Sequence, residues 1–304
     1  MSKAYIFYNP LAGDGRCKED VSMLECVLPD EIVYCDMTKS ETYERDLFSL
    51  EPGDYLILCG GDGTLNRFVN LVGDMELHHE ILYFPLGTDN DFATDLGHKY
   101  FDNPFPINEY IRNLPSVAVN GKIFRFLNGI GYGLDGFCCE EGDKHRENSE
   151  EKINYTSIAV RGLLRDYQPT SAVVTVDGVA HRYKKVWLAP TMFGRFYGGG
   201  IMPTPNQHRE DTTQKLSVMV VHDINKLHAL ALFPSIFKGE HVRHKKYIDI
   251  FEGNTISVAF DRPTLLHIDG ELIRNVSAYR QMKRGKVYFN LAPIGQYSVH
   301  QIGI

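Results

Sequence analysis

Apolar runs alternate with helical apolar stripes along the first 115 residues. Short apolar runs typical of strands covered on both faces span residues 4–8, 31–35, 55–59 and 81–84. After these runs, apolar residues recur every three or four positions, as one face of a helix requires, in residues 17–28, 43–50, 65–72, 92–96 and 107–114. This alternation predicts a parallel sheet with helices on its faces.

The rest of the chain is rich in predicted strands. Val119-Asn120-Gly121-Lys122 predicts a hairpin turn. Further strands are predicted at 173–176, 186–189, 216–221, 247–251, 255–260, 265–268 and 286–291, and helices at 153–167 and 225–236. Residues 140–152 mix both charges, and we interpret them as a solvated connection. Many strands separated by turn signals predict a sandwich or barrel.

Composition narrows the class of protein. A chain of 304 residues suggests about two domains, and 43% hydrophobic with 23% charged residues is ordinary for a globular protein. The net charge of −7 argues against a general nucleic-acid binder.

The six cysteines include no CxxC pair, which favours free thiols in a reducing cytosol. The most apolar stretch, 227–237, has about half of the length of a membrane span, so we expect a cytoplasmic protein.

A glycine-rich loop, Gly60-Gly61-Asp62-Gly63-Thr64, joins the third predicted strand to an amphipathic helix. Glycines let the backbone approach an anion closely and expose its N–H groups, and the helix adds the positive end of its dipole. Asp62 would repel a bare phosphate. It therefore implies a nearby Mg²⁺, an acid–base role or a hydrogen-bond acceptor.

Two similar loops, at 9–15 and 85–91, follow the first and fourth predicted strands. The carboxyl ends of parallel strands share one edge of the sheet, where ligands bind. Three loops converging there suit a polyphosphate. Thr38 could also face this site, although a capping-box pattern with Glu41 explains it equally well.

Several other catalytic motifs are absent from the sequence. It has no Walker GxxxxGK[ST] loop, no GxSxG and no HExxH. Residues 131–136 match GxGxxG, but they lie among predicted strands and no long helix clearly follows. That context disfavours a dinucleotide site.

A second candidate site lies near the C-terminus, at Asp269-Gly270-Glu271. Asp-Gly between apolar runs is a standard hairpin turn, and Asp177-Gly178 offers a similar turn without a following carboxylate. On the residues alone, the role of Glu271 stays open.

Taken together, these motifs resemble the diacylglycerol kinase catalytic-domain family. The matching segments are NPxxGxG at 9–15, GGDGTLN at 60–66, PLGTxNDFA at 85–93 and DGE at 269–271. Their order and spacing match over nearly the whole chain, and the chain looks most like the soluble bacterial lipid kinases, whose relatives include sphingosine kinases. GGDGT alone is less specific, because NAD kinases and phosphofructokinases carry a similar loop.

The resemblance implies a fold and a division into domains. We expect an α/β plus all-β fold, with a Rossmann-like nucleotide-binding domain at 1–118 that is completed by about 287–304. A β-sandwich lipid-substrate domain would occupy 119–286. ATP, Mg²⁺ and the acceptor lipid would meet in the cleft between the domains.

The same resemblance assigns roles to individual residues. Glu271 would be the catalytic base, Asp62 would help to place metal and phosphates, and Asp135 and Asp269 would form a supporting polar network. The residues implied to contact ATP are Asn9, Pro10, Leu11, Ala12, Gly13, Thr38, Gly60, Gly61, Asp62, Gly63, Thr64, Leu65, Asn66 and Thr88.

Four positions depart from the family pattern. Arg67 replaces the usual Glu, Asp89 replaces a small residue, and Phe193-Gly194-Arg195 replaces NGR. The segment from Thr212 to Val218 replaces a DDGxLDV segment that supplies a structural Mg²⁺ ligand, so we expect this metal site to be lost.

These observations predict an ATP-dependent lipid kinase that converts diacylglycerol to phosphatidate at the inner membrane face. A catalytically weak nucleotide-binding regulator and a kinase of a soluble acceptor such as NAD are the alternatives. The basic residues of 241–246 could touch anionic headgroups, or could simply be a solvated stretch. Whether the chain forms a homodimer is left open.

Overall fold

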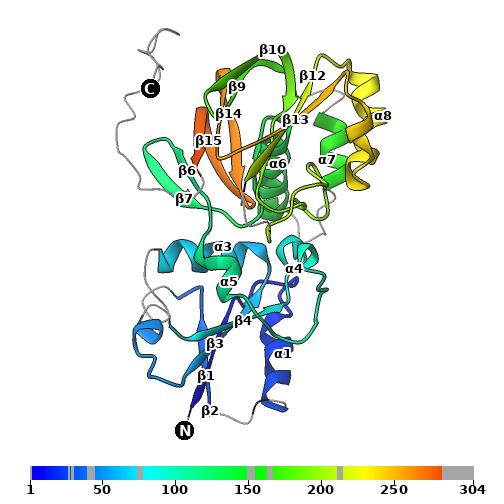
Figure 1. The fold of residues 1–304 in the computed structure, drawn as a ribbon. Coiled ribbons are helices and arrows are strands. Elements are labelled where there is room, and N and C mark those ends of the chain that lie inside the picture. Colours follow the sequence, from blue (N-terminus) through cyan, green and yellow to red (C-terminus); the bar gives the residue numbers. More distant parts are fainter. Residues whose placement is uncertain are drawn as a thin grey trace.

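The computed structural model describes residues 2–26, 28, 31–39, 45–73, 78–148, 155–162, 167–210 and 215–282. Figure 1 shows an α/β unit formed by the start of the chain and a β-rich unit formed by the remainder. This is the predicted fold class. The strand expected at 286–291, and with it the return of residues 287–304 to the first domain, lies outside the described residues.

The first sheet has the strand order β2-β1-β3-β4-β5 within the described residues. The first four strands run parallel and β5 is antiparallel to β4; they are β1 (Lys3–Tyr8), β2 (Glu31–Asp36), β3 (Tyr55–Gly60), β4 (Glu80–Pro85) and β5 (Phe105–Pro106). Its helices are α1 (Cys17–Val21), continued by η1 (Ser22–Cys26), then α3 (Asp62–Val72), α4 (Asp91–Asp95) and α5 (Asn108–Arg112). Residues 45–48 are helical as expected, whereas Glu41 and Tyr43 lie outside the described residues.

The second sheet closes on itself like a barrel. Its strands are β6 (Ser116–Val119), β7 (Lys122–Arg125), β8 (Gly129–Tyr132), β9 (Thr170–Val176), β10 (Val179–Leu188), β11 (Thr191–Met192), β12 (Leu216–His222), β13 (Ile248–Gly253), β14 (Thr255–Ile268) and β15 (Glu271–Met282). The N-terminal half of β14 pairs with β9 and its C-terminal half with β8, which completes the ring. The two strands predicted at 255–260 and 265–268 are therefore one strand, with an irregular register between Ala259 and Thr264.

A helix follows the GxGxxG segment, contrary to our expectation. α6 (Leu134–Asn148) runs through most of the stretch interpreted as a solvated connection. Lys144 pairs with Glu140 and Glu141 at helical spacing, which explains how a charged segment stays helical. The preceding strand, β8, has antiparallel neighbours, so the segment still lacks the parallel βαβ context of a dinucleotide site.

The remaining helices of the second unit are α7 (Tyr155–Arg161), α8 (Lys226–Phe237) and the short η3 (Glu240–Arg243). Asn225 caps α8 by accepting a hydrogen bond from the His228 amide. His241 belonged to the predicted basic surface cluster, but it is fully buried and its Nε2 lies 2.8 Å from the Pro203 carbonyl oxygen. No helix in the described part of the chain combines the length and apolar character that crossing a membrane needs.

The two units are packed into one body. The largest cluster of buried apolar side chains includes Phe68 of α3 and Phe92 of α4 together with Phe126 and Tyr132 of the second unit. Figure 1 shows α3 and α4 at the boundary between the units. The predicted division at residue 118 falls within β6, which pairs with β15 and so belongs to the second sheet.

Candidate active site

A cleft of about 1180 Å³ lies where the carboxyl ends of β1, β3 and β4 face the second unit. The residues that follow these strands form one wall, in loops 9–14, 61–64 and 87–89. α6, α8, Tyr197–Ile201 and the Asp269–Glu271 turn contribute the other wall. The three glycine loops and the DGE segment therefore share one cleft.

Two glycines allow the second and third loops to touch. A Cβ on Gly87 would lie 2.2 Å from the Gly61 Cα, and one on Gly61 would lie 2.8 Å from the Asp89 carbonyl oxygen. A side chain at either position would push backbone against backbone. A Cβ on Gly63, in contrast, would meet nothing within 4 Å, and Gly63 lines the cleft. Of these three glycines, Gly63 is therefore the one with open space for a ligand beside it.

The Asp62 carboxylate holds the second loop, 61–64, in place. It accepts hydrogen bonds from the Asp91 amide at 2.7 Å and the Phe92 amide at 3.0 Å. Burial, together with the nearby charge of Asp91, raises the pKa of Asp62 well above its usual range. Of the roles considered for this residue, that of hydrogen-bond acceptor is the one these contacts fill.

Asp91 extends this chain of contacts to the second unit. Its carboxylate accepts hydrogen bonds from the amides of Gly199 at 2.9 Å and Gly200 at 2.8 Å. Burial raises its pKa to about 6. The sequence reasoning gave Asp91 no role, although its place in the PLGTxNDFA motif was visible.

Asp269 ties the DGE turn to both units. Its carboxylate accepts hydrogen bonds from the amides of Leu127, Asn128 and Gly129 at 2.6, 2.9 and 2.9 Å. The Asn66 side chain in α3 donates a fourth, at 2.8 Å. A carboxylate held by three amides and one side chain fixes the turn against the glycine loop.

The turn itself has the geometry predicted from Asp-Gly. Asp269 and Gly270 both have positive φ, 46° and 94°, and Ile268 pairs with Glu271 across the hairpin. Glu271 is exposed and is the first residue of β15, at the wall of the cleft. Asp177-Gly178 forms the same kind of turn, with φ of 46° and 86°, outside the cleft.

Asp135 lies deeper in the cleft, beside Tyr197 and His267. Its Oδ2 atom is buried without a hydrogen-bond partner, and burial raises its pKa to about 7. His267 stacks on Tyr197 with ring centroids 5.5 Å apart, and burial lowers its pKa to about 4. The neutral ring accepts a hydrogen bond from the Gly270 amide at Nδ1, so it supports the DGE turn. Our sequence reasoning missed His267, because a lone histidine within a strand carries no signal.

The cleft also has a group of apolar lining side chains, which belong to one hydrophobic cluster. These side chains come from α6, α7, α8 and the residue after the glycine run, and they are Leu134, Cys138, Ala159, Ile201, Phe233 and Phe237. The lining of the cleft thus combines polar loops, carboxylates and apolar side chains.

Most of the predicted nucleotide residues line this cleft. They are Asn9, Leu11, Ala12, Gly13, Gly61, Asp62, Gly63, Thr64 and Thr88. Leu65 is instead buried in the core, and Asn66 faces Asp269. Thr38 is exposed and donates to Asp36 at 2.6 Å, and Pro10, Gly60 and Thr38 are outside the lining of the cleft.

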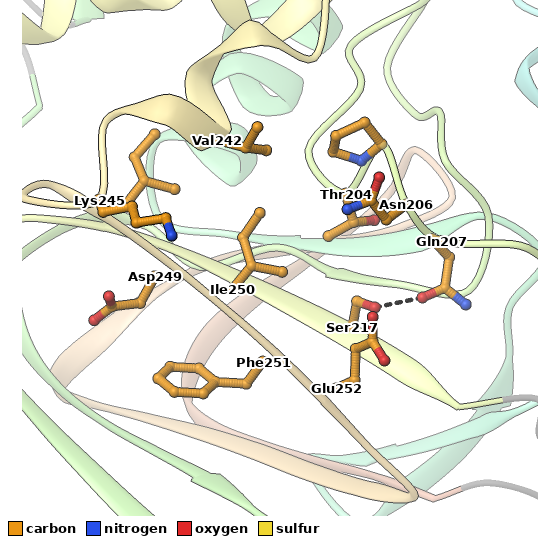
Figure 2. Close-up of a pocket in the computed structure, with 12 residues that line it drawn as sticks. Thr204, Asn206, Gln207, Ser217, Val242, Lys245, Asp249, Ile250, Phe251 and Glu252 are labelled. Carbon is orange, nitrogen blue, oxygen red and sulfur yellow. Dashed lines mark hydrogen bonds between the residues drawn. The ribbon is translucent and has the colours of Figure 1, made fainter.

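A second cavity of about 610 Å³ lies against β12 and β13, and Figure 2 shows the side chains that line it. Ser217 in its floor donates a hydrogen bond to Gln207, whose amide in turn donates to the Lys215 carbonyl at 2.8 Å. None of the predicted catalytic or nucleotide residues lines this cavity.

The segment expected to have lost a structural Mg²⁺ ligand, Thr212 to Val218, runs into β12 beside this cavity. Thr212, Thr213 and Gln214 lie outside the described residues, so the loss of the metal site stays a prediction. Val218 is fully buried and pairs with Phe251 of β13, and its hydrocarbon side chain offers no oxygen to a metal. Ser217 uses its hydroxyl in the neutral hydrogen bond to Gln207. The described end of the segment therefore serves packing of the second sheet.

Residues 3–118 match the diacylglycerol kinase catalytic domain, and residues 128–287 match the YegS C-terminal NAD kinase beta sandwich-like domain. The chain belongs to the diacylglycerol kinase catalytic-domain family. Family membership makes it kinase-like, with ATP as the implied phosphoryl donor.

Individual relatives agree with this assignment. Proteins of Staphylococcus aureus strains JH9 and Mu3, both named "Putative lipid kinase", are 26% identical over 257 residues, which cover 80% of this chain and 77% of theirs. A Bacillus anthracis str. Sterne structure described as "a putative diacylglycerol kinase" has a TM-score of 0.63 at 19% identity, covering 92% of this chain and 93% of that one. At this identity the structural likeness supports the fold alone.

Proposed function

We propose that the protein is an ATP-dependent lipid kinase that phosphorylates a lipid hydroxyl, with diacylglycerol as the acceptor and phosphatidate as the product. One observation carries the proposal: Glu271 lies in the same cleft as the three glycine loops. A triphosphate held by the loops and a hydroxyl next to Glu271 would then occupy the same cleft.

In this proposal, the chain positions the nucleotide and the lipid hydroxyl and provides one proton acceptor. The Glu271 carboxylate takes the proton of the lipid hydroxyl as its oxygen forms a bond to the γ-phosphorus. The bond between the γ-phosphorus and the bridging oxygen breaks, and ADP leaves with that oxygen. The apolar wall of α6, α7 and α8 would hold the acyl chains.

The residues of the cleft fit a nucleotide-bound Mg²⁺ better than a resident metal. Among the described residues, no three His, Cys, Asp or Glu side chains form a group that could hold a metal ion. Mg²⁺ in kinases needs only one or two carboxylates besides the phosphates. Asp135, whose Oδ2 atom is buried without a hydrogen-bond partner in the wall of the cleft, is suited to this role. When bound, the ion would neutralise phosphate charge.

The decisive experiment incubates the purified chain with labelled ATP, Mg²⁺ and a mixed lipid extract, and identifies the labelled product. Phosphatidate supports the proposal, and a different labelled lipid would correct only the acceptor. A parallel incubation replaces the lipid extract with NAD, and labelled product there without any labelled lipid would favour a soluble acceptor instead.

Glu271→Gln should reduce turnover to background while ATP affinity changes less than about threefold, because only the proton acceptor is lost. Glu252→Gln is the matched control, since Glu252 is an exposed strand glutamate that lines the second cavity. Unchanged turnover in Glu271→Gln would remove Glu271 from its assigned role.

A nucleotide-binding regulator is the second candidate. Asp89 lines the cleft near Gly199, where its negative charge opposes phosphate binding. ATP binding without turnover on any lipid of the extract would favour this candidate.

A further inference from the structure

Acidic side chains far outnumber basic ones in the described lining of the cleft. Among the described residues that line it, the carboxylates are Asp14, Asp62, Asp89, Asp91, Asp135, Asp269 and Glu271. The same lining includes a single arginine, Arg67, and no lysine. Burial raises the pKa of Asp62, Asp91 and Asp135, but each carboxylate of the lining that stays ionised would repel a triphosphate at short range.

Part of this negative charge is already compensated within the protein. Asp62, Asp91 and Asp269 each accept at least two backbone N–H hydrogen bonds. Such bonds spread a carboxylate's charge over the amides that hold it. The amides that hold these carboxylates do not neutralise the charge of a bound phosphate. A cation is therefore still needed where the phosphates would lie.

Arg67 is the arginine in the described lining of the cleft. It follows Gly63 by four residues in α3, so the two lie on the same face of the helix. Gly63 is open and Arg67 is exposed, and both line the cleft. The neighbouring Asn66 is bonded to Asp269, which brings the start of α3 against the Asp269-Gly270-Glu271 turn. Arg67 therefore lines the cleft one helical turn from Gly63, on a helix that contacts the Asp269-Gly270-Glu271 turn.

We propose that Arg67 binds the outer phosphates of the nucleotide and positions the phosphoryl group that is transferred. A guanidinium group offers paired N–H donors that match two phosphate oxygens, and its charge offsets that of the surrounding carboxylates. The transfer step rests on the proposed function, whereas the binding role does not. Loss of the positive charge should therefore weaken ATP and ADP binding selectively.

The test measures the affinities of AMP, ADP and ATP, each with Mg²⁺, for the full chain and for Arg67→Gln, Arg67→Lys and Arg67→Glu. In Arg67→Gln, ATP affinity should fall about tenfold to hundredfold, as expected for a lost charge-assisted hydrogen bond, while AMP affinity changes less than about twofold. Arg67→Lys should bind ATP more tightly than Arg67→Gln does, because it keeps the positive charge. Arg67→Glu should bind ATP more weakly than Arg67→Gln does.

Arg243→Gln is the matched control, because Arg243 is an exposed arginine outside the cleft, and it should bind all three nucleotides like the unaltered chain. Circular dichroism and the unfolding midpoint check that each variant is folded. Equal losses for AMP and ATP, unchanged ATP affinity in Arg67→Gln, or no nucleotide binding by the unaltered chain would overturn the assignment.

The two proposals fail in different ways. Suppose that no lipid is phosphorylated but that Arg67→Gln lowers the affinity for ATP and not that for AMP. The phosphate-binding role of Arg67 then stands, and the lipid kinase proposal fails. If lipid phosphorylation is found and both kcat and KM for ATP are unchanged in Arg67→Gln, the role of Arg67 fails and the kinase proposal stands.

Discussion

At the scale of single residues, Asp135 is the ionisable group whose environment most directly predicts a pH effect. Burial raises its pKa to about 7, against an ordinary value of 3.8. Between these values the folded chain keeps a proton that the unfolded chain has lost. Stability therefore falls as pH rises through this window, and the loss is complete above about pH 7.

Asp135→Asn should remove this loss. We compare the free energy of unfolding of the variant with that of the unaltered chain. From pH 5 to pH 8, this difference should shift in favour of the variant by about 1 to 4 kcal/mol. Urea unfolding without nucleotide at both pH values measures the difference. Asp91, whose pKa is also raised, contributes to both proteins, so the comparison isolates Asp135. Parallel pH profiles would contradict the prediction.

Among the elements, the strand-to-helix loops depend on close backbone packing. The sequence reasoning explained the glycines of the GGDGT loop by the approach of an anion. The contacts divide them: Gly61 is required by its packing against Gly87, and Gly63 is the glycine that opens to the cleft.

Gly87→Ala should therefore destabilise the fold by about 3 kcal/mol, because the added methyl group would meet backbone atoms that cannot move away. Gly63→Ala is the matched comparison, and it should leave the unfolding midpoint nearly unchanged. Thermal unfolding of both variants tests the distinction, and equal destabilisation would show that the loop packing has been misread.

At the scale of the whole molecule, a buried ion pair joins the two units. Asp95, at the end of α4, accepts a hydrogen bond from Arg209 Nε at 2.7 Å, and both side chains are 2% exposed. Arg209 also donates to the Leu127 carbonyl at 3.0 Å and to the Asn128 side chain at 2.9 Å. This arginine therefore joins α4 of the first unit to the start of β8 in the second.

Asp95→Asn should lower the free energy of unfolding by about 3–5 kcal/mol, because it leaves the buried Arg209 and the partly exposed Arg195 without the carboxylate that they share. Glu141→Gln weakens the surface pairings with Lys144 and Arg161 and should cost less than about 1 kcal/mol. Denaturant unfolding compares the two. Similar small losses would mean that Arg209 is compensated by its carbonyl and amide partners alone.

Local patterns in the sequence determined the secondary structure of the first domain, the Asp269-Gly270 hairpin and the edge of the sheet that carries the site. Apolar runs of strand length and helical stripes predicted the parallel sheet, and Asp269-Gly270 predicted its hairpin, because these features depend on neighbours within a few residues. Recurrent glycine loops after consecutive parallel strands also predicted one edge as the site. The helix at Leu134–Asn148 was misread, since its charges pair only once the helix exists.

Tertiary structure decided the rest. It brought Asn66 to Asp269 across 203 positions of the chain, and Asp91 to Gly199 across 108. It also gave Asp62 amide partners, buried Asp135 and left Arg67 as the arginine of an acidic cleft. These properties arise from desolvation and long-range contact, which depend on what the folded chain places around a side chain and not on its neighbours in sequence.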